Sequence, residues 1–223
     1  MEKSKFHIRV ATEADQVYAS NIIEEMATSA AKRGTGIARR SVEYIEKKML
    51  EGKAVIALTL DKVWAGFCYI ESWDHEKYVV NSGLIVAPEF RMTGLAKAIK
   101  SEIFQLSRKK YPNAKIFGLT TGSAVMKINS SLGYIPVSYS DLTKDEEFWK
   151  GCQSCVNYDI LQSKYKQNCI CTAMLYTPKP ESKGKALRKN FTKNIKLFER
   201  WTRIKKHVML KLKKHSSQLV NLF

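Results

Sequence analysis

A six-residue segment near the middle of the chain has an arginine, a glycine and an alanine at the spacing R-x-x-G-x-A, from Arg91 to Ala96. Glycine lets backbone pass close to a ligand, and the N–H groups at a helix start point outward, where the helix dipole favours a phosphate. An apolar strand and a proline precede the segment, and a long amphipathic pattern follows it. We interpret it as a cradle for a pyrophosphate, although the hexapeptide alone also fits a solvated arginine before an ordinary helix.

These residues resemble the [QR]-x-x-G-x-[GA] motif of the GNAT family of acyl-CoA-dependent N-acyltransferases, and the resemblance covers nearly all of residues 6–177. It implies a mixed α/β fold, in which helices flank a mixed central sheet. It also implies acetyl-CoA or another acyl-CoA as co-substrate, with no metal needed for the chemistry. A strand amide would polarise the thioester carbonyl. The residues expected along coenzyme A are Leu84, Ile85 and Val86 at pantetheine, and Arg91, Met92, Thr93, Gly94, Leu95 and Ala96 at the pyrophosphate.

A narrower resemblance is to the acyltransferase domain of N-acetylglutamate synthases, which act in arginine biosynthesis. It rests on the segments Ile8–Thr12, Gly36–Ser41, Leu119–Ser123 and Gly133–Val137. It implies glutamate as the acceptor. Two carboxylates need fixed cations, and an arginine can bind each one through two hydrogen bonds.

The expected acceptor-binding residues are Arg39 and Arg40, with Ser123 as a hydroxyl donor. The alternative to acceptor binding is that the two arginines are a solvated pair on the surface of a basic protein. One departure from the family pattern is that Gly122 stands where the synthases usually have an arginine. Either another residue supplies that contact to the acceptor, or the acceptor differs.

Acyl transfer requires that the acceptor amine lose a proton and that the leaving thiolate gain one. The family often carries a carboxylate on the strand before the motif, but residues 79–82 offer none. We therefore expect a water relay through Asn81 or Glu71. Tyr134 is a candidate donor to the leaving sulfur, with packing as its alternative role. Direct attack in a ternary complex needs no protein nucleophile.

The elements that position these residues follow from periodicity and from Gly, Pro and capping signals. Thr12 followed by Asp15 is close to a capping box, so a helix is expected from there to about Thr28, and Ser41 can cap a second helix that runs to Met49. Further helices are expected after Gly94 and from Ala124 to Ser131. Strands are expected at Phe6–Val10, Ala54–Leu60, Val63–Ile70, Tyr78–Val86 and Ile116–Thr120, after Leu132 and at Ile170–Tyr176.

The composition describes one folded domain with a basic appendage. The 223 residues are 44% hydrophobic and carry a formal charge of +17, which excludes a disordered chain and a large multidomain machine. Residues 181–223 hold 13 Lys and Arg against two Asp and Glu. We expect an acyltransferase domain at 1–178 and a basic amphipathic helix at 179–223. That helix could pack on its own domain or a second copy, or lie on an anionic membrane surface; nucleic acid is the least favoured partner.

Five cysteines are an odd number in a chain long enough to have a hydrophobic core, so a disulfide framework is neither needed nor implied, and reduced thiols are expected. Cys152, Cys155, Cys169 and Cys171 could bind a structural zinc across a strand hairpin, or could be spare thiols. The chain shows no signal-peptide or membrane-span pattern, so we expect a cytoplasmic protein.

Two other functions stay open at this stage. One is a GNAT acetyltransferase acting on another small amine or on a protein N-terminus. The other is a non-catalytic tethering module that works through its basic tail.

Overall fold

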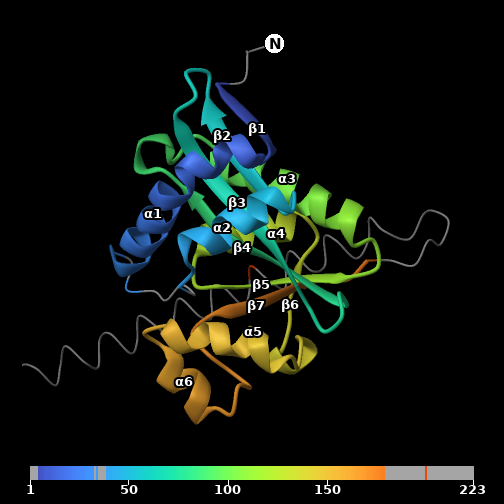
Figure 1. The fold of residues 1–223 in the computed structure, drawn as a ribbon. Coiled ribbons are helices and arrows are strands. Elements are labelled where there is room, and N and C mark those ends of the chain that lie inside the picture. Colours follow the sequence, from blue (N-terminus) through green and yellow to red (C-terminus); the bar gives the residue numbers. More distant parts are fainter. Residues whose placement is uncertain (1–4, 33, 35–38, 179–198, 200–223) are drawn as a thin grey trace, which may run out of the picture. The chain divides into compact units, whose positions relative to one another are not determined.

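The computed structural model describes residues 5–32, 34, 39–178 and 199. The tail predicted at 179–223 therefore lies outside the described residues, apart from Glu199. Seven strands form one mixed sheet in the order β1-β2-β3-β4-β5-β7-β6 (Figure 1). Their bounds are β1 Phe6–Val10, β2 Ala54–Thr59, β3 Trp64–Trp73, β4 Tyr78–Val86, β5 Lys115–Thr120, β6 Ile135–Pro136 and β7 Thr172–Tyr176.

Six α-helices accompany the sheet in the described part of the chain: α1 Ala19–Lys32, α2 Val42–Leu50, α3 Leu95–Lys110, α4 Ser123–Ser131, α5 Glu146–Lys150 and α6 Tyr158–Ser163. Short 3-10 turns join them at Glu13–Tyr18, Pro88–Phe90, Tyr139–Asp141 and Gly151–Ser154. This arrangement confirms the predicted mixed α/β class. None of the described helices has the length and apolar character needed to cross a bilayer.

The expected elements match the structure most closely from β1 to α4. Ser41 caps α2 by accepting a hydrogen bond from the Tyr44 amide at 3.2 Å, as its position predicts. The first expected helix instead begins as the 3-10 turn Glu13–Tyr18 and continues as α1 to Lys32. The strand expected after Leu132 is only two residues long, because it pairs with the edge of β7 at Ile135 and Pro136 alone.

The two faces of the sheet are covered by different helices. Ser82 of β4 hydrogen-bonds to Glu71, which also contacts Tyr44 of α2. The preceding residue, Asn81, hydrogen-bonds to Ser107 of α3. Because successive strand residues point to opposite faces, α2 and α3 lie on opposite sides of β4. Helices α5 and α6 lie together near β7 and β6 (Figure 1).

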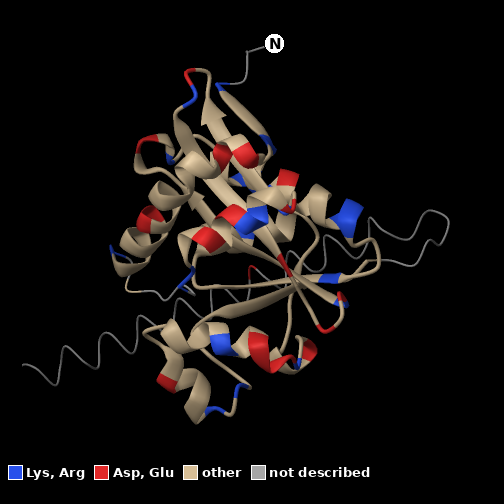
Figure 2. Cartoon of the chain, viewed as in Figure 1, with Lys and Arg blue, Asp and Glu red and all other residues tan. Residues whose placement is uncertain are grey.

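Charges of both signs are interspersed over the described part in the view of Figure 2. Most of the excess positive charge belongs to residues 181–223. An electrostatic argument about the folded part must therefore rest on individual arginines rather than on the net charge of the chain.

Candidate acyl-CoA and acceptor site

Strands β4 and β5 pair only over a short stretch and then separate. Their parallel register joins Tyr78–Val80 to residues 115–117, whereas β4 continues to Val86. Residues 81–86 therefore present an edge without a β5 partner in the described structure, as Figure 1 shows by the divergence of the two strands. Such an edge offers backbone N–H and C=O groups to an extended ligand.

A β-bulge lies where the strands separate. The register between β3 and β4 shifts between Phe67 and Tyr69, and Gly83 there has φ of +64°. A Cβ on Gly83 would stand 2.4 Å from the Tyr69 ring and 2.6 Å from the Met26 methyl group, so only glycine fits. The bulge re-aims the backbone at the open edge. Gly83 was not among the predicted site residues, although a glycine inside a strand pattern often marks a bulge.

The predicted pyrophosphate segment forms a turn that leads into α3. Gly94 is the N-cap residue with φ of +84°, and residues 91–94 are exposed. Within the described residues, no acceptor takes a hydrogen bond from the N–H groups of residues 92–96. A Cβ on Gly94 would meet no atom within 4 Å. The turn thus combines open space, exposed donors and the positive end of a sixteen-residue helix.

The Arg91 side chain turns away from this open space. Its Nε donates to the Val86 carbonyl at 3.1 Å, and its Nη2 donates to Glu25 and Ser29 of α1 at 2.6 and 2.7 Å. Arg91 therefore holds the turn between β4 and α1. Backbone groups of the turn, rather than the Arg91 guanidinium, face the open side.

The remaining predicted coenzyme residues differ in exposure. Leu84 is half-buried, whereas Ile85 and Val86 are buried with 6% and 8% of their surface exposed. These two can therefore contribute mainly backbone to a ligand on the free edge. Met92 is fully exposed and Leu95 is buried at the start of α3.

Arg40 and Glu71, predicted for acceptor binding and catalysis, form one buried network. Arg40 Nη2 donates to Glu71 Oε1 at 2.9 Å, and the Tyr44 hydroxyl donates to the same oxygen at 2.6 Å. Ser82 donates to Glu71 Oε2 at 2.5 Å. Tyr69 lies close enough to interact electrostatically with both charges. Glu71 is only 4% exposed, so its charge is balanced almost entirely by these donors.

The network shifts the pKa values of Arg40 and Tyr44. Burial alone would lower the pKa of Arg40, but the Glu71 carboxylate outweighs burial and raises it. Burial and the Glu71 charge both raise the pKa of Tyr44, so its hydroxyl stays protonated and donates. Tyr44 and Ser82 were not among the predicted residues, because their roles depend on the pairing of β3 with β4 and on the packing of α2.

Arg39 is exposed, and within the described residues its guanidinium makes no ion pair. Its backbone amide donates to Ser154 Oγ at 3.1 Å, and its carbonyl accepts from Arg40 Nη1 at 3.2 Å. Among the described residues, Arg39 is therefore held through its backbone, and its guanidinium has no ion-pair partner there. Ser123 is also exposed, at the first residue of α4 after β5.

Asn81 and Tyr134 come together on the opposite face of β4, against α3. The Tyr134 hydroxyl donates to Asn81 Oδ1 at 3.2 Å, and Asn81 Nδ2 donates to Ser107 Oγ at 2.7 Å. Tyr134 is 2% exposed and Asn81 is 8% exposed. The three predicted catalytic residues are thus divided between two faces, with Glu71 apart from the other two.

Lys100 of α3 lies in the same buried region and was not predicted. Its Nζ lies 5.4 Å from the centroid of the Tyr134 ring, and the residue is 2% exposed. Burial lowers the pKa of Lys100 to about 8, opposed only by the nearby Cys68. Burial also raises the pKa of the Cys68 thiol to about 11. Lys100 was not predicted because a lysine in an amphipathic helix is expected to be exposed, whereas this one occupies an inward position on α3.

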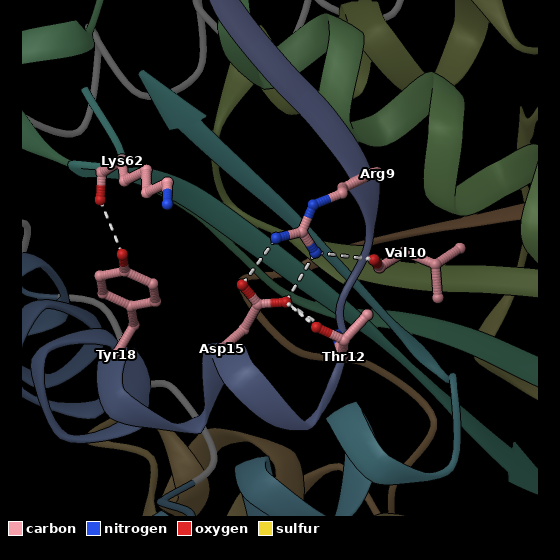
Figure 3. A network of polar contacts seen from close by, with 6 residues as sticks. All are labelled: Arg9, Val10, Thr12, Asp15, Tyr18 and Lys62. Carbon is pink, nitrogen blue, oxygen red and sulfur yellow. Dashed lines mark hydrogen bonds and ion pairs between the residues drawn. The ribbon is translucent and has the colours of Figure 1, made fainter. Parts of the chain in front are cut away.

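The N-terminal segment Ile8–Thr12 proves to have a structural use. Arg9 binds Asp15 through two hydrogen bonds of 2.6 and 2.8 Å, and the Thr12 amide donates to Asp15 at 2.7 Å (Figure 3). Burial alone would raise the pKa of Asp15, but the bonds from Arg9 and Thr12 outweigh it and lower the pKa. The Thr12–Asp15 capping box predicted from the sequence is present.

The cysteines do not meet across a strand hairpin. Cys152 lies within the 3-10 turn Gly151–Ser154 and Cys155 follows it, whereas Cys169 and Cys171 precede β7, which begins only at Thr172. The intervening chain forms α6 instead of a strand. In the described part, no group of three or more His, Cys, Asp or Glu side chains is arranged to hold a metal ion.

Comparison with known proteins identifies the fold. No protein-family profile and no curated protein matches the sequence. Among solved structures, N-acetylglutamate synthase of Neisseria gonorrhoeae, complexed with coenzyme A and N-acetyl-glutamate, aligns over 80% of this chain with a TM-score of 0.56 and 16% identity. This chain spans 36% of the length of that synthase.

Two further structures match over nearly their whole length. Rv2747 of Mycobacterium tuberculosis, in complex with CoA, is 16% identical over 77% of this chain and 98% of its own, with a TM-score of 0.55. A GNAT-family acetyltransferase of Staphylococcus aureus is 12% identical over 78% of this chain and 99% of its own, with a TM-score of 0.54. The chain therefore has the GNAT acyltransferase fold, which confirms the resemblance predicted from its motif.

Proposed function

We propose that the chain is an acyl-CoA-dependent N-acyltransferase that transfers an acetyl or succinyl group to the α-amine of glutamate. The observation that carries this proposal is the continuity between the unpaired edge of β4 and the exposed N–H groups of the Gly94 turn. An extended thioester could pair with the first while its pyrophosphate occupies the second. Two of the structurally similar proteins were solved with coenzyme A, which supports this choice of co-substrate.

The acceptor side would use the two arginines differently. Arg39 has an exposed, unpaired guanidinium in the described structure and would bind a carboxylate of the acceptor. Arg40 is already paired with Glu71 and would hold the Glu71 carboxylate in position. Ser123 would add a hydroxyl donor. A dicarboxylate acceptor fits one free arginine supported by further donors, and the N. gonorrhoeae synthase was solved with N-acetyl-glutamate.

Proton transfer would run through Ser82 to Glu71. Ser82 is half-buried at the open part of β4, and its hydroxyl already donates to Glu71. The acceptor ammonium would lose its proton to this pair before its nitrogen attacks the thioester carbon. A backbone amide near the bulge would stabilise the oxyanion, and the departing thiolate would be protonated by solvent. Asn81 is a weaker candidate, because its amide is buried against Ser107 and Tyr134.

The direct test is a thiol-release assay with acetyl-CoA and succinyl-CoA against a panel of amino acids, a polyamine and peptide N-termini. We expect turnover with glutamate to exceed that with glutamine, because glutamine lacks the second carboxylate. Turnover with another amine but not with glutamate would contradict the acceptor and leave the acyl transfer standing. No thiol release with any pair would contradict the proposal as a whole.

Gly94→Ala tests the pyrophosphate cradle. A left-handed alanine costs about 1 kcal/mol of stability, and its methyl group would occupy the open side of the turn. We expect the KM for acyl-CoA to rise roughly tenfold, which corresponds to about 1.4 kcal/mol of lost binding, with little change in the acceptor KM. Gly52→Ala is the matched control, because Gly52 has φ of +59° at the end of α2. Equal effects of both variants on the acyl-CoA KM would contradict the assignment.

Arg39→Ala and Arg40→Ala separate the two arginines. Removing Arg39 should raise the acceptor KM without changing thermal stability, because its side chain has no described partner. Removing Arg40 should lower stability and kcat, because Glu71 then loses its buried countercharge. If Arg39→Ala instead raised the KM for acyl-CoA, Arg39 would belong to the coenzyme side.

A further inference from the structure

The four cysteines outside the proposed active site surround a single small cavity. The cavity has a volume of about 30 Å³, and its walls include all four side chains. Two come from the turn at Cys152 and Cys155, and two from the segment at Cys169 and Cys171, after thirteen intervening residues. The fifth cysteine, Cys68, is buried elsewhere against Ser82. The fold has therefore gathered the cysteines of two distant pairs at one place.

The backbone around the first pair forms a closed turn, and one of its amides donates to a sulfur atom. The Cys155 amide donates to the Cys152 carbonyl at 2.9 Å, which closes the C-x-x-C turn. The Asn157 amide donates to Cys155 Sγ at 3.4 Å. A backbone N–H aimed at a sulfur stabilises negative charge on it. Cys152 in turn lies close enough to Cys155 and Cys169 to interact with them electrostatically.

The second pair is held against the same cavity by a neighbouring tyrosine. The Tyr139 hydroxyl donates to the Cys171 carbonyl at 3.0 Å, and the Tyr139 ring stacks on Trp149 at 5.9 Å. Leu119 and Leu161 are among the apolar residues that line the cavity. A sulfur-lined cavity with apolar walls and no carboxylate among its lining residues favours a borderline-soft cation over calcium or magnesium.

We propose that Cys152, Cys155, Cys169 and Cys171 bind one zinc ion as a structural four-thiolate site. Each thiol would release its proton to solvent and bond to the ion through sulfur, with no change of oxidation state. The four side chains are not arranged around an ion in this structure. Binding would therefore require the four side chains to turn inward by rotation about χ1, between staggered rotamers.

The site would fasten the segment that carries Arg39. Ser154 lies between the two cysteines of the C-x-x-C turn, and its hydroxyl accepts the hydrogen bond from the Arg39 amide. A metal that fixes this turn would thereby fix the backbone of an acceptor-binding residue. This consequence rests on the proposed function, whereas zinc binding itself does not.

The test measures metal in the resting full-length chain. Protein expressed in zinc-supplemented medium and purified without chelator should contain about one zinc per chain by mass spectrometry, as a closed four-ligand site requires. Cobalt(II) added to the chelator-treated chain should give the intense sulfur-to-cobalt charge-transfer bands and visible d–d bands of tetrahedral thiolate coordination. Neither measurement involves acyl-CoA, so a failure of acyl transfer leaves the zinc result unaffected, and the reverse also holds.

Variants assign the ligands. Cys155→Ser and Cys169→Ser should each weaken zinc affinity at least tenfold and shift the cobalt bands, while Cys68→Ala should retain both properties. The wild-type cobalt spectrum needs no variant, so it decides the question even if a substituted chain fails to fold. A wild-type chain without zinc and without thiolate–cobalt bands would overturn the proposal. Loss of metal in Cys68→Ala alone, or fewer than five titratable thiols in the denatured, chelated protein, would overturn it as well.

Discussion

On one face of β4, the buried carboxylate of Glu71 is matched by Arg40, Tyr44 and Ser82. On the other face, the contacts described for the buried Lys100 ammonium are with the ring of Tyr134 and with the Cys68 thiol, whose pKa is raised by burial. The two faces of the sheet thus accommodate a buried charge in different ways. The first pairs opposite charges, and the second lowers the pKa of a single cation until it can become neutral.

The two faces of the sheet are therefore suited to different tasks. The paired face carries an arginine whose pKa is raised by the Glu71 carboxylate, which suits recognition of a charged acceptor. The unpaired face responds to pH near 8, which suits packing or proton exchange but not a permanent charge. In sequence, the exposed Gly94 turn follows β4, which carries Ser82, and precedes Lys100 of α3.

The largest effect is expected from Glu71→Gln. The variant keeps the shape of the side chain but leaves Arg40 as an uncompensated, mostly buried charge. We expect the free energy of unfolding to fall by about 3 to 5 kcal/mol. Chemical denaturation measures this, with Glu76→Gln in the exposed β3–β4 turn as the matched control. A loss equal to that of the control would remove the basis for contrasting the two faces.

Lys100→Met tests the unpaired face through pH. The folded pKa of about 8 lies below the ordinary value of 10.5, so the unfolded chain binds more protons between these values. Stability should therefore rise with pH across this window, by about 3 kcal/mol in total from this group. In Lys100→Met this part of the rise should be absent, and the variant should be more stable than the wild type below pH 8. Parallel pH–stability curves for the two proteins would show that Lys100 has a partner.

A pair of tyrosine variants compares the faces with the same chemical change. Tyr44→Phe removes a donor to a carboxylate, whereas Tyr134→Phe removes a donor to an amide oxygen. Hydrogen bonds to charged groups contribute more, so we expect losses of about 2 kcal/mol and about 1 kcal/mol in the free energy of unfolding. The reverse order would show that Glu71 does not depend on Tyr44.

The elements around the predicted coenzyme segment were predicted well, because their signals are local. A strand, a proline, a glycine turn and a helix follow one another without interruption, and each is specified by neighbouring residues. Ser41 and the Thr12–Asp15 capping box were found for the same reason. Helices α5 and α6 were missed because their five- and six-residue lengths give too few periodic positions.

The catalytic candidates were harder, because their roles depend on pairs far apart in the chain. Asn81 and Glu71 were predicted as alternatives for one task, yet they lie on opposite faces of the sheet. The alternation of strand residues determined that separation, but the register between β3 and β4 includes a bulge that sequence spacing does not reveal.

By itself, the sequence determined the order of elements from β1 to α4, the glycine turn before α3 and the clustering of positive charge after residue 180. Short-range backbone preferences and local charge counts are enough for each of these. Only the tertiary structure decided that Arg40 faces Glu71, that Lys100 is buried without a countercharge among the described residues and that two cysteine pairs share one cavity. These are contacts between segments that are not neighbours in the sequence, and packing of the whole domain selects them.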